Sequence, residues 1–161
     1  MLDRTDKRIL DLLQIDATLA VAEIADQVGL STTPCWRRLQ RLEHEGYIDR
    51  RVALLSPEKL NAAVNVFVML KVPHHSQAWI DEFDSTVRGM PEILEVYRMS
   101  GDIDYLLRIV VPDIGTYDAV YKRLINRVSL GDVSSSFAME QIKFTTALPL
   151  DNVETTQRRK S

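Results

Sequence analysis

Cysteine is nearly missing from this sequence, because Cys35 is the only one among 161 residues. One thiol excludes a disulfide within the chain and any metal site built from cysteines alone. Long apolar runs are missing as well: the longest span four or five residues, whereas a bilayer crossing needs about 20. The N-terminus lacks the apolar stretch of a secretory signal. We therefore expect a cytoplasmic protein with no membrane partner.

The composition gives no sign of disorder. Apolar residues make up 45% of the chain and charged residues 27%, which are globular averages. A chain of 161 residues fits one domain or two small ones, and it buries roughly two-thirds of its unfolded surface. We therefore expect a folded protein with a substantial core.

An excess of positive charge is also missing. The net charge is −3, and residues 1–60 hold nine Lys or Arg against ten Asp or Glu. Totals hide local distribution, however, because residues 31–42 contain three arginines and no acid, and Arg50-Arg51 follows soon after. The sequence therefore permits a DNA-binding helix and predicts modest non-specific binding.

Helical periodicity begins near the N-terminus. Asp3 suits the N-cap of a first helix, with Asp6 in its first turn, and apolar residues follow at 9–13. A second apolar stripe runs from residue 21 to 28 at helical spacing and stops at Gly29, which suits a left-handed turn. These patterns predict two short helices separated from a third by a glycine turn.

A third helix is predicted from Ser31, its N-cap, to about Gly46. Its narrow buried face consists of Cys35, Leu39 and Leu42. Two short apolar runs, at 47–48 and 52–55, surround the polar residues 49–51 and predict a small β-wing. Residues 1–55 are therefore interpreted as a winged helix-turn-helix domain.

The start of the third helix fits DNA recognition, because the major groove admits one helix whose N-terminal end meets base edges first. Arginines there can reach phosphates or a guanine edge, and the helix amides can hold a phosphate. The predicted DNA-contacting residues are Ser31, Thr32, Thr33, Trp36, Arg37, Arg38, Arg41, Arg50 and Arg51. Trp36 fits either a DNA contact or the core, and the whole unit fits either DNA binding or plain packing with a solvated arginine face.

The hydrophobic period changes after a predicted linker at residues 56–63. Residues 64–72 alternate as a strand that is apolar on both faces and therefore needs cover on both. A helix, a hairpin of strands 92–99 and 103–111, a second helix and a strand at 133–145 complete the order βαββαβ, the ferredoxin-like unit. We expect this effector domain to occupy residues 64–148, before a flexible tail at 149–161.

Several separated motifs occur in one order: Leu2-Asp3-Arg4-Thr5-Asp6, the stretch 28–39, Gly46-Tyr47-Ile48 and Ser100-Gly101-Asp102-Ile103-Asp104-Tyr105. In these motifs residues 2–148 resemble the leucine-responsive/asparagine-regulator (Lrp/AsnC) family of bacterial transcription factors. The stretches 53–59, 74–76 and 134–143 are similar to the branch that senses cysteine and activates a cysteine-detoxifying desulfidase. Related branches respond to proline, branched-chain or other amino acids.

The resemblance implies a homo-oligomeric regulator that binds a double-stranded DNA operator and associates with the nucleoid when bound. Two effector sheets would pack face to face in a dimer, and dimers would form a ring as a tetramer or octamer. An amino acid bound between dimers would bias assembly and thereby DNA binding.

A bound amino acid needs an acid for its ammonium group and amides or hydroxyls for its carboxylate. The residues that combine this chemistry with the family pattern are Met99, Ser100, Gly101, Asp102, Asp104, Tyr105, Ser134, Ser135 and Ser136. The alternative is that the glycine turn is turn chemistry alone and that the serines are solvated residues at the start of a strand.

Some residues depart from the pattern or fit other classes. Ala20 stands where the family has a Ser or Thr cap, which should cost about 1 kcal/mol unless Thr18 caps one turn earlier. Cys35 is expected to pack in the core rather than act as a redox switch. His74 and His75 are expected in a solvated loop rather than at a metal.

An enzyme or an amino-acid-sensing module that does not bind DNA is the alternative class. The sequence has no nucleophile paired with an identifiable base, no phosphate-binding glycine loop and no HExxH-type spacing. We therefore expect no catalytic residues, no metal and no cofactor other than an amino-acid effector.

Overall fold

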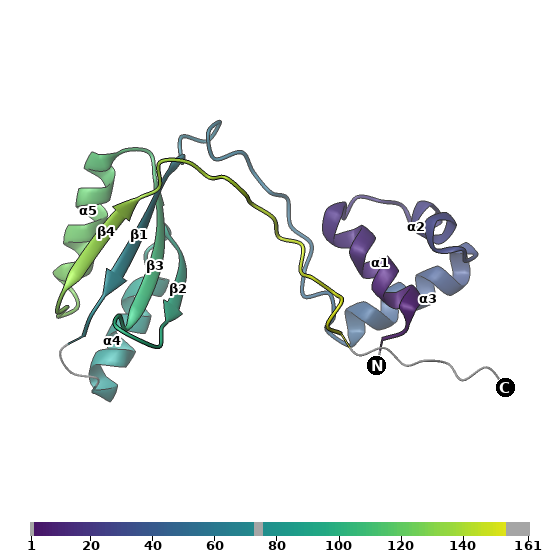
Figure 1. Cartoon of the computed structure of the whole chain (residues 1–161), viewed down its shortest axis with the longest axis horizontal. Helices are drawn as coiled ribbons and strands as arrows, with labels where there is room; N and C mark the ends of the chain where they lie inside the picture. The colour runs from purple at the N-terminus through teal and green to yellow at the C-terminus, as the bar shows by residue number, and fades with distance from the viewer. Residues whose placement is uncertain (1, 73–75, 154–161) are drawn as a thin grey trace. The chain divides into compact units, whose positions relative to one another are not determined.

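A computed structural model describes residues 2–72 and 76–153 of the chain (Figure 1). The chain divides into two compact units. The helical unit consists of residues up to 53 together with the described residues from 143 on, and the sheet unit consists of residues 54–142. No helix in residues 2–72 and 76–153 is long and apolar enough to span a membrane.

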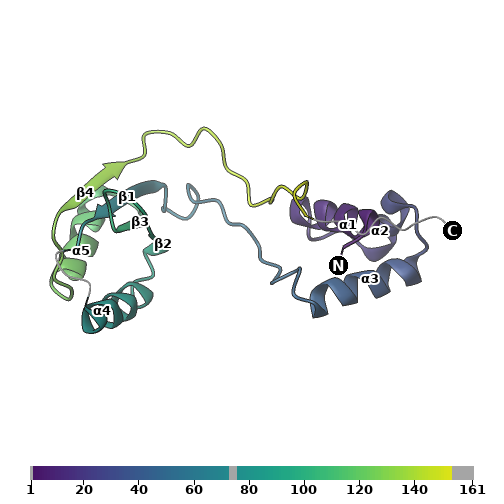
Figure 2. The same ribbon diagram turned by 60° about the horizontal axis from the view of Figure 1, so that its bottom comes forward.

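The helical unit contains the three predicted helices, α1 (Arg4–Ile15), α2 (Val21–Val28) and α3 (Thr32–His44) (Figure 2). The Asp3 carboxylate accepts a hydrogen bond from the Asp6 N–H, and the Asp6 carboxylate accepts one from the Asp3 N–H. This reciprocal capping box fixes the start of α1. Gly29, with φ of 69°, makes the left-handed turn between α2 and α3. The helix-turn-helix is therefore confirmed.

Helix α2 begins without a side-chain cap. Ala20 occupies the N-cap position, and the Glu23 carboxylate accepts a hydrogen bond from its N–H at 2.7 Å. The reciprocal bond is missing because alanine has no acceptor. The suggestion that Thr18 caps instead is wrong, because its N–H and hydroxyl both donate to Asp16.

The core of the helical unit includes Cys35, which is fully buried. Burial raises the pKa of its thiol, although the positive charge of Arg38 acts in the opposite direction. A buried thiol with a raised pKa is mostly protonated and unreactive at neutral pH. The structure thus supports the packing role.

The predicted β-wing is wrong. The described residues 49–56 form no strand, because the first apolar run, Tyr47-Ile48, completes the end of α3 instead. The N–H groups of Tyr47 and Ile48 both donate to the Leu42 carbonyl and so finish the C-terminus of α3. Without a partner strand, Leu54 and Leu55 lie 65% and 69% exposed.

The end of the described chain returns to the helical unit. The Gln14 side-chain amide donates to the Leu148 carbonyl and accepts from the Leu148 N–H, at 3.0 and 2.9 Å. Val153 packs at the edge of the helical core. Contacts therefore place residues from 143 on with the helical unit, although their sequence was assigned to the effector domain and its tail.

The sheet unit has the predicted βαββαβ order. Its elements are β1 (Val64–Leu70), α4 (Gln77–Arg88), β2 (Ile93–Arg98), β3 (Tyr105–Val111), α5 (Ile114–Ile125) and β4 (Val133–Phe137). The strands pair antiparallel in the order β2-β3-β1-β4. This is the ferredoxin-like arrangement, and the α+β fold is confirmed.

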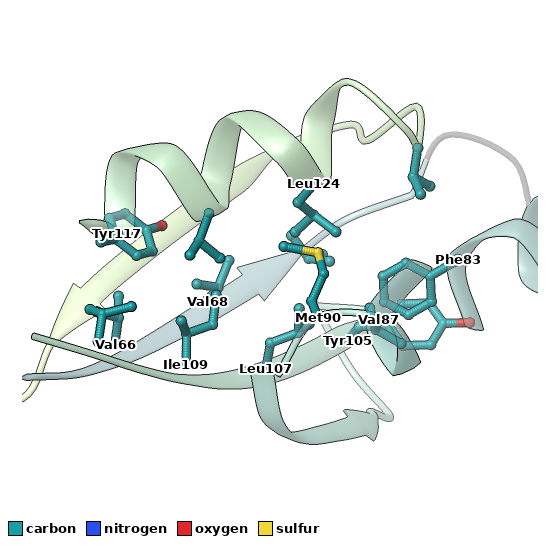
Figure 3. Close-up of a cluster of buried hydrophobic side chains, with 14 of the residues drawn as sticks. Val66, Val68, Phe83, Val87, Met90, Tyr105, Leu107, Ile109, Tyr117 and Leu124 are labelled. Atoms are coloured by element: carbon teal, nitrogen blue, oxygen red, sulfur yellow. The ribbon is translucent and has the colours of Figure 1, made fainter. Parts of the chain in front are cut away.

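The core of the sheet unit lies between one face of the sheet and the two helices (Figure 3). Alternate residues of β1 and β3, such as Val66, Val68 and Leu107, point to this side and are buried. Phe83 from α4 and Leu124 from α5 close the core from the other side. Period-two alternation in the strands thus meets helical period in the covering layer.

Strand β4 is shorter than predicted and ends at Phe137 rather than at residue 145. The reason is the length of its partner, because Phe137 pairs with Val66 and β1 begins only two residues earlier, at Val64. Ala138 still donates to the Asn65 carbonyl. Beyond it, Met139 and Ile142 are 95% and 90% exposed.

Candidate functional site

Helix α3 presents a polar surface opposite its buried stripe. Cys35, Leu39 and Leu42 are buried. At 100° per residue, Thr33, Arg37 and Gln40 lie on the opposite side, and all three are exposed. Trp36 is 51% exposed, so it belongs to this surface and not to the core. We call the residues Thr32, Thr33, Trp36, Arg37 and Gln40 the outer face of α3.

The three arginines of α3 differ in their surroundings. Arg37 is exposed and forms none of the ion pairs found among the described residues. Arg38 Nη1 lies 2.7 Å from Asp3 Oδ2 and 2.6 Å from Asp6 Oδ1. Arg41 Nη2 lies 2.5 Å from Asp6 Oδ2. The sequence predicted the same DNA-contacting role for all three, but the structure engages two of them within the protein.

These ion pairs keep both partners charged. Burial opposes the charged form of Asp3, but the N–H of Asp6 and the guanidinium of Arg38 outweigh it and lower the pKa of Asp3. Burial likewise opposes the charge of Arg38, but hydrogen bonds to Asp3 and Asp6 raise its pKa. The hydrogen bond to Asp6 also raises the pKa of Arg41. The charged forms of Asp3, Arg38 and Arg41 are therefore favoured by these contacts.

The remaining predicted DNA contacts come before and after α3 in the chain. Ser31 occupies the N-cap of α3, makes no side-chain capping bond and is exposed. Arg51 pairs with Glu43 at 2.7 Å, and Arg50 lies 3.6 Å from Asp49 with 78% of its side chain exposed. Sequence reasoning omitted Gln40, which the helical period alone places beside Trp36 and Arg37.

The hairpin between β2 and β3 carries the predicted ligand-binding turn. Gly101 has φ of 116°, and the space around a Cβ there is open. The requirement for glycine is therefore conformational rather than steric. Ser100 and Asp102 flank it and are exposed, and Met99 is 39% exposed. These residues form one accessible turn at an end of the sheet.

Asp104 holds the hairpin in place. Its carbonyl accepts from the Met99 N–H at 2.8 Å, and its own N–H donates to the Leu70 carbonyl at 2.8 Å. Its carboxylate accepts from the Val72 N–H at 2.7 Å. Asp104 thus joins the turn to the end of β1, and its carboxylate is already engaged by the backbone.

Tyr105 belongs to the core of the sheet unit, and its predicted role in ligand binding stays a prediction. Its side chain is 7% exposed and packs against the rings of Trp79 and Phe83, with centroid distances of 5.7 and 4.7 Å (Figure 3). The alternation that buries Leu107 places Tyr105 on the same side of β3.

The three consecutive serines of β4 lie on two faces. Ser134 and Ser136 pair with Met69 and Phe67, whose side chains point away from the helices. Ser135 points the other way, and its hydroxyl hydrogen-bonds that of Tyr117. One binding site in this chain cannot use all three, because neighbouring strand residues point apart.

The sheet face away from the helices is apolar with a charged centre. Phe67 and Tyr97 are 37% and 51% exposed, and Met69, Leu106 and Val110 are half-buried beside them. In the middle, Arg108 lies 2.5 Å from Glu95 and donates to Asn65 at 3.0 Å. We call this surface the open face of the sheet.

No metal-binding group of three or more His, Cys, Asp or Glu side chains occurs within residues 2–72 and 76–153. His74 and His75 lie outside the described residues, so their predicted loop stays a prediction.

Comparison with known families identifies a domain in each unit. Residues 2–43 match the AsnC-type helix-turn-helix domain, and residues 65–148 match the Lrp/AsnC ligand binding domain. The DNA-binding transcriptional activator DecR of Escherichia coli is 51% identical over 152 residues, which cover 94% of this chain and 100% of DecR. The glutamate uptake regulatory protein of Zymomonas mobilis is 48% identical over 160 residues, 99% of this chain and 98% of the relative.

Solved structures agree with these sequence matches. An AsnC family transcriptional regulator from Agrobacterium tumefaciens superposes with a TM-score of 0.92 at 59% identity, over 95% of this chain and 100% of the other. A transcriptional regulator of Neisseria meningitidis in complex with L-Met superposes with a TM-score of 0.89 at 36% identity, over 94% and 98% of the two chains.

Proposed function

The chain belongs to the Lrp/AsnC family of DNA-binding transcriptional regulators, and on that premise we propose that a small amino acid controls its assembly or its affinity for DNA. Its relatives are regulators and not enzymes, which sets aside the catalytic alternative. The observation that carries the proposal is the pairing of an exposed, cationic outer face on α3 with an exposed glycine turn in a ligand-binding domain.

The outer face of α3 is the proposed base-reading surface. Thr32, Thr33 and Trp36 lie in its first turns, where a helix in the major groove meets base edges. Arg37 beside them can bind a guanine edge or a phosphate. Ser31 and the exposed Arg50 and Arg51 are proposed to contact the DNA backbone, because they adjoin α3 in the chain and their side chains are accessible.

The Ser100-Gly101-Asp102 turn is the proposed effector site. The exposed Asp102 carboxylate can pair with the ligand ammonium, and glycine allows close approach of the backbone to the ligand carboxylate. The Neisseria relative that binds L-Met supports an amino acid as the ligand class. Asp104 is proposed to position the turn through Val72 rather than to bind the ligand with its engaged carboxylate.

Cysteine is our first choice of effector because of the resemblance in residues 53–59 and 134–143. Proline and branched-chain amino acids are the alternatives from related branches. The glutamate uptake regulator at 48% identity adds glutamate to the ligands worth testing.

The open face is the proposed contact between two copies of the chain. Its apolar side chains are exposed in the single chain, and burying such surface contributes about 25 cal/mol per Å². A second copy supplies an equal apolar face around a two-fold axis. Rings of such dimers would bring two hairpin turns together and complete the effector site.

A thermal-shift screen tests the effector. The full-length protein, with reducing agent present, is melted with each of the twenty amino acids. A ligand at 100 times its Kd should add about 2.7 kcal/mol of stability. Asp102→Ala should abolish the shift, and Glu82→Ala, at an exposed acid of α4, should leave it intact. A shift that survives Asp102→Ala would place the ligand elsewhere.

Operator binding tests the DNA interface independently. A duplex selected from random sequences by the full-length protein is titrated with wild type and Arg37→Ala. We expect affinity to fall about tenfold or more, since a base-edge contact contributes roughly 1–3 kcal/mol. Arg88→Ala, which removes an exposed arginine of α4, is the matched control. An equal loss of DNA affinity in both variants would contradict the assignment of the outer face of α3 to base recognition.

A further inference from the structure

Four charged side chains meet where the start of α1 packs beside α3. Asp6 is the centre of this group and is 1% exposed. Its Oδ1 binds Arg38, and its Oδ2 lies beside Arg41 while accepting the Asp3 N–H at 3.0 Å. Asp3 provides a second carboxylate for Arg38. Two acids and two bases therefore form a neutral cluster, which we call the α1–α3 cluster.

The cluster is asymmetric in exposure. The side chains of Arg38 and Arg41 remain 29% and 38% exposed, whereas Asp6 is buried. A buried carboxylate is stable only when it is paired. Asp6 thus needs the arginines, but the arginines, at the surface, need only some anion. On a DNA-binding surface the competing anion is phosphate.

The two arginines border the recognition surface. Arg41 is four residues from Arg37 and is its neighbour on the helix surface, and Arg38 follows Arg37 directly. Released from Asp6, their side chains would extend the positive charge of the outer face of α3. In the observed arrangement Arg37 is the α3 arginine without a carboxylate partner among the described residues.

We propose that Asp6, assisted by Asp3, determines DNA specificity by engaging Arg38 and Arg41 in ion pairs, so that these arginines do not bind DNA phosphates. The interaction removes two potential phosphate contacts from the recognition helix, so binding depends more on base edges read by the outer face. This inference rests on the proposed use of that face for DNA. It also fits the charge balance of residues 1–60, which predicts only modest non-specific attraction to DNA.

The salt dependence of non-specific binding tests the proposal. The full-length protein is titrated with a duplex of unrelated sequence at several salt concentrations. In Asp6→Asn, Arg41 loses its carboxylate partner and Arg38 keeps only Asp3. The plot of log affinity against log salt should therefore steepen by between about 1 and 2, since each phosphate contact contributes about 0.9. Non-specific affinity should rise roughly tenfold near 0.2 M salt, and the ratio of operator to non-specific affinity should fall. An unchanged slope in folded Asp6→Asn would overturn the proposal.

Variants of the arginines keep the test decisive if Asp6→Asn does not fold. Arg38→Gln should bind the unrelated duplex with the same salt slope as wild type, because the charge of Arg38 is already paired in the wild-type protein. Arg37→Ala should lower the slope by about 1. A loss of about 1 in Arg38→Gln would mean that this arginine contacts phosphate, which overturns the proposal.

The same titrations separate this inference from the proposed function. If wild type binds no selected duplex, or Arg37→Ala binds as wild type does, the recognition face itself is wrong. If Arg37→Ala weakens binding while the slopes of Asp6→Asn and wild type coincide, only the role of Asp6 fails.

Discussion

The two units of the chain differ in what they leave exposed. The helical unit packs the apolar sides of its helices into one core and shows a polar outer face on α3, with its buried acid paired to arginines. The sheet unit buries one face under α4 and α5 but leaves Phe67, Tyr97 and their neighbours uncovered. The difference fits the two partners proposed above: a charged, hydrated one for the helices and a second apolar surface for the sheet.

The strongest way to test this separation is to damage one core alone. Leu107 is fully buried in the sheet unit, and Leu107→Ala should lower the free energy of unfolding of that unit by about 2–5 kcal/mol through the cavity it leaves. Urea unfolding followed by circular dichroism measures the loss. Leu94→Ala, at a residue 55% exposed, should change it by less than about 0.5 kcal/mol. Equal losses of stability in both variants would contradict the burial of Leu107 and the exposure of Leu94.

A charged substitution on the open face tests whether a second copy of the chain packs there. Phe67→Asp should weaken self-association about a hundredfold, because an unpaired carboxylate buried in an interface costs roughly 3 kcal/mol. Sedimentation velocity over a concentration series measures the change. Ile114→Asp, at the exposed start of α5, introduces the same charge on the opposite side and should leave assembly unchanged. Assembly that survives Phe67→Asp would mean that copies meet through another surface.

The helical unit can be strengthened where its capping is incomplete. Ala20→Ser supplies the missing acceptor for the start of α2 and should add about 1 kcal/mol to stability. Thermal unfolding monitors the gain. Ala22→Ser, on the exposed surface two residues into the same helix, should bring no gain. A gain of equal size from both serines would point to a cause other than capping.

The smallest expected effect is a change in how the stability of the folded protein depends on acidic pH. The pKa of Asp3 is lowered in the folded protein, so its ionised form contributes stability above the unfolded pKa of about 4. That contribution is lost as the pH falls through the folded pKa. It is modest because the side chain is 40% exposed and screened by solvent. Acid titration of unfolding should therefore show a shallower loss in Asp3→Asn than in wild type below pH of about 4.

Local periodicity was enough to predict most elements. The stripes in α1, α2 and α3 and the alternation in β1 and β3 depend on near neighbours, so the sequence displays them directly. The β-wing and the length of β4 were wrong because they depend on partners. Tyr47 and Ile48 complete α3 instead of pairing, and β4 ends at Phe137, opposite Val66, only two residues from the start of β1.

The candidate sites show the same limit. The outer face of α3 follows from helical period. Period-two alternation would have separated Ser135 from Ser134 and placed Tyr105 in the core, although all three were predicted in one ligand site. The pairing of Arg38 with Asp6 joins residues 32 positions apart. It depends on how two helices pack, and nothing in a single sequence specifies that contact.

Two hydrogen bonds between the side-chain amide of Gln14 and the backbone of Leu148 connect the two ends of the described chain. The amide donates and accepts as a backbone residue does in a β-ladder, and it ties residues that follow the sheet unit to the helical unit. The sheet unit is therefore an insertion, joined to its host by two covalent connections rather than one. A shortened protein that stops at residue 142 would lose part of the host.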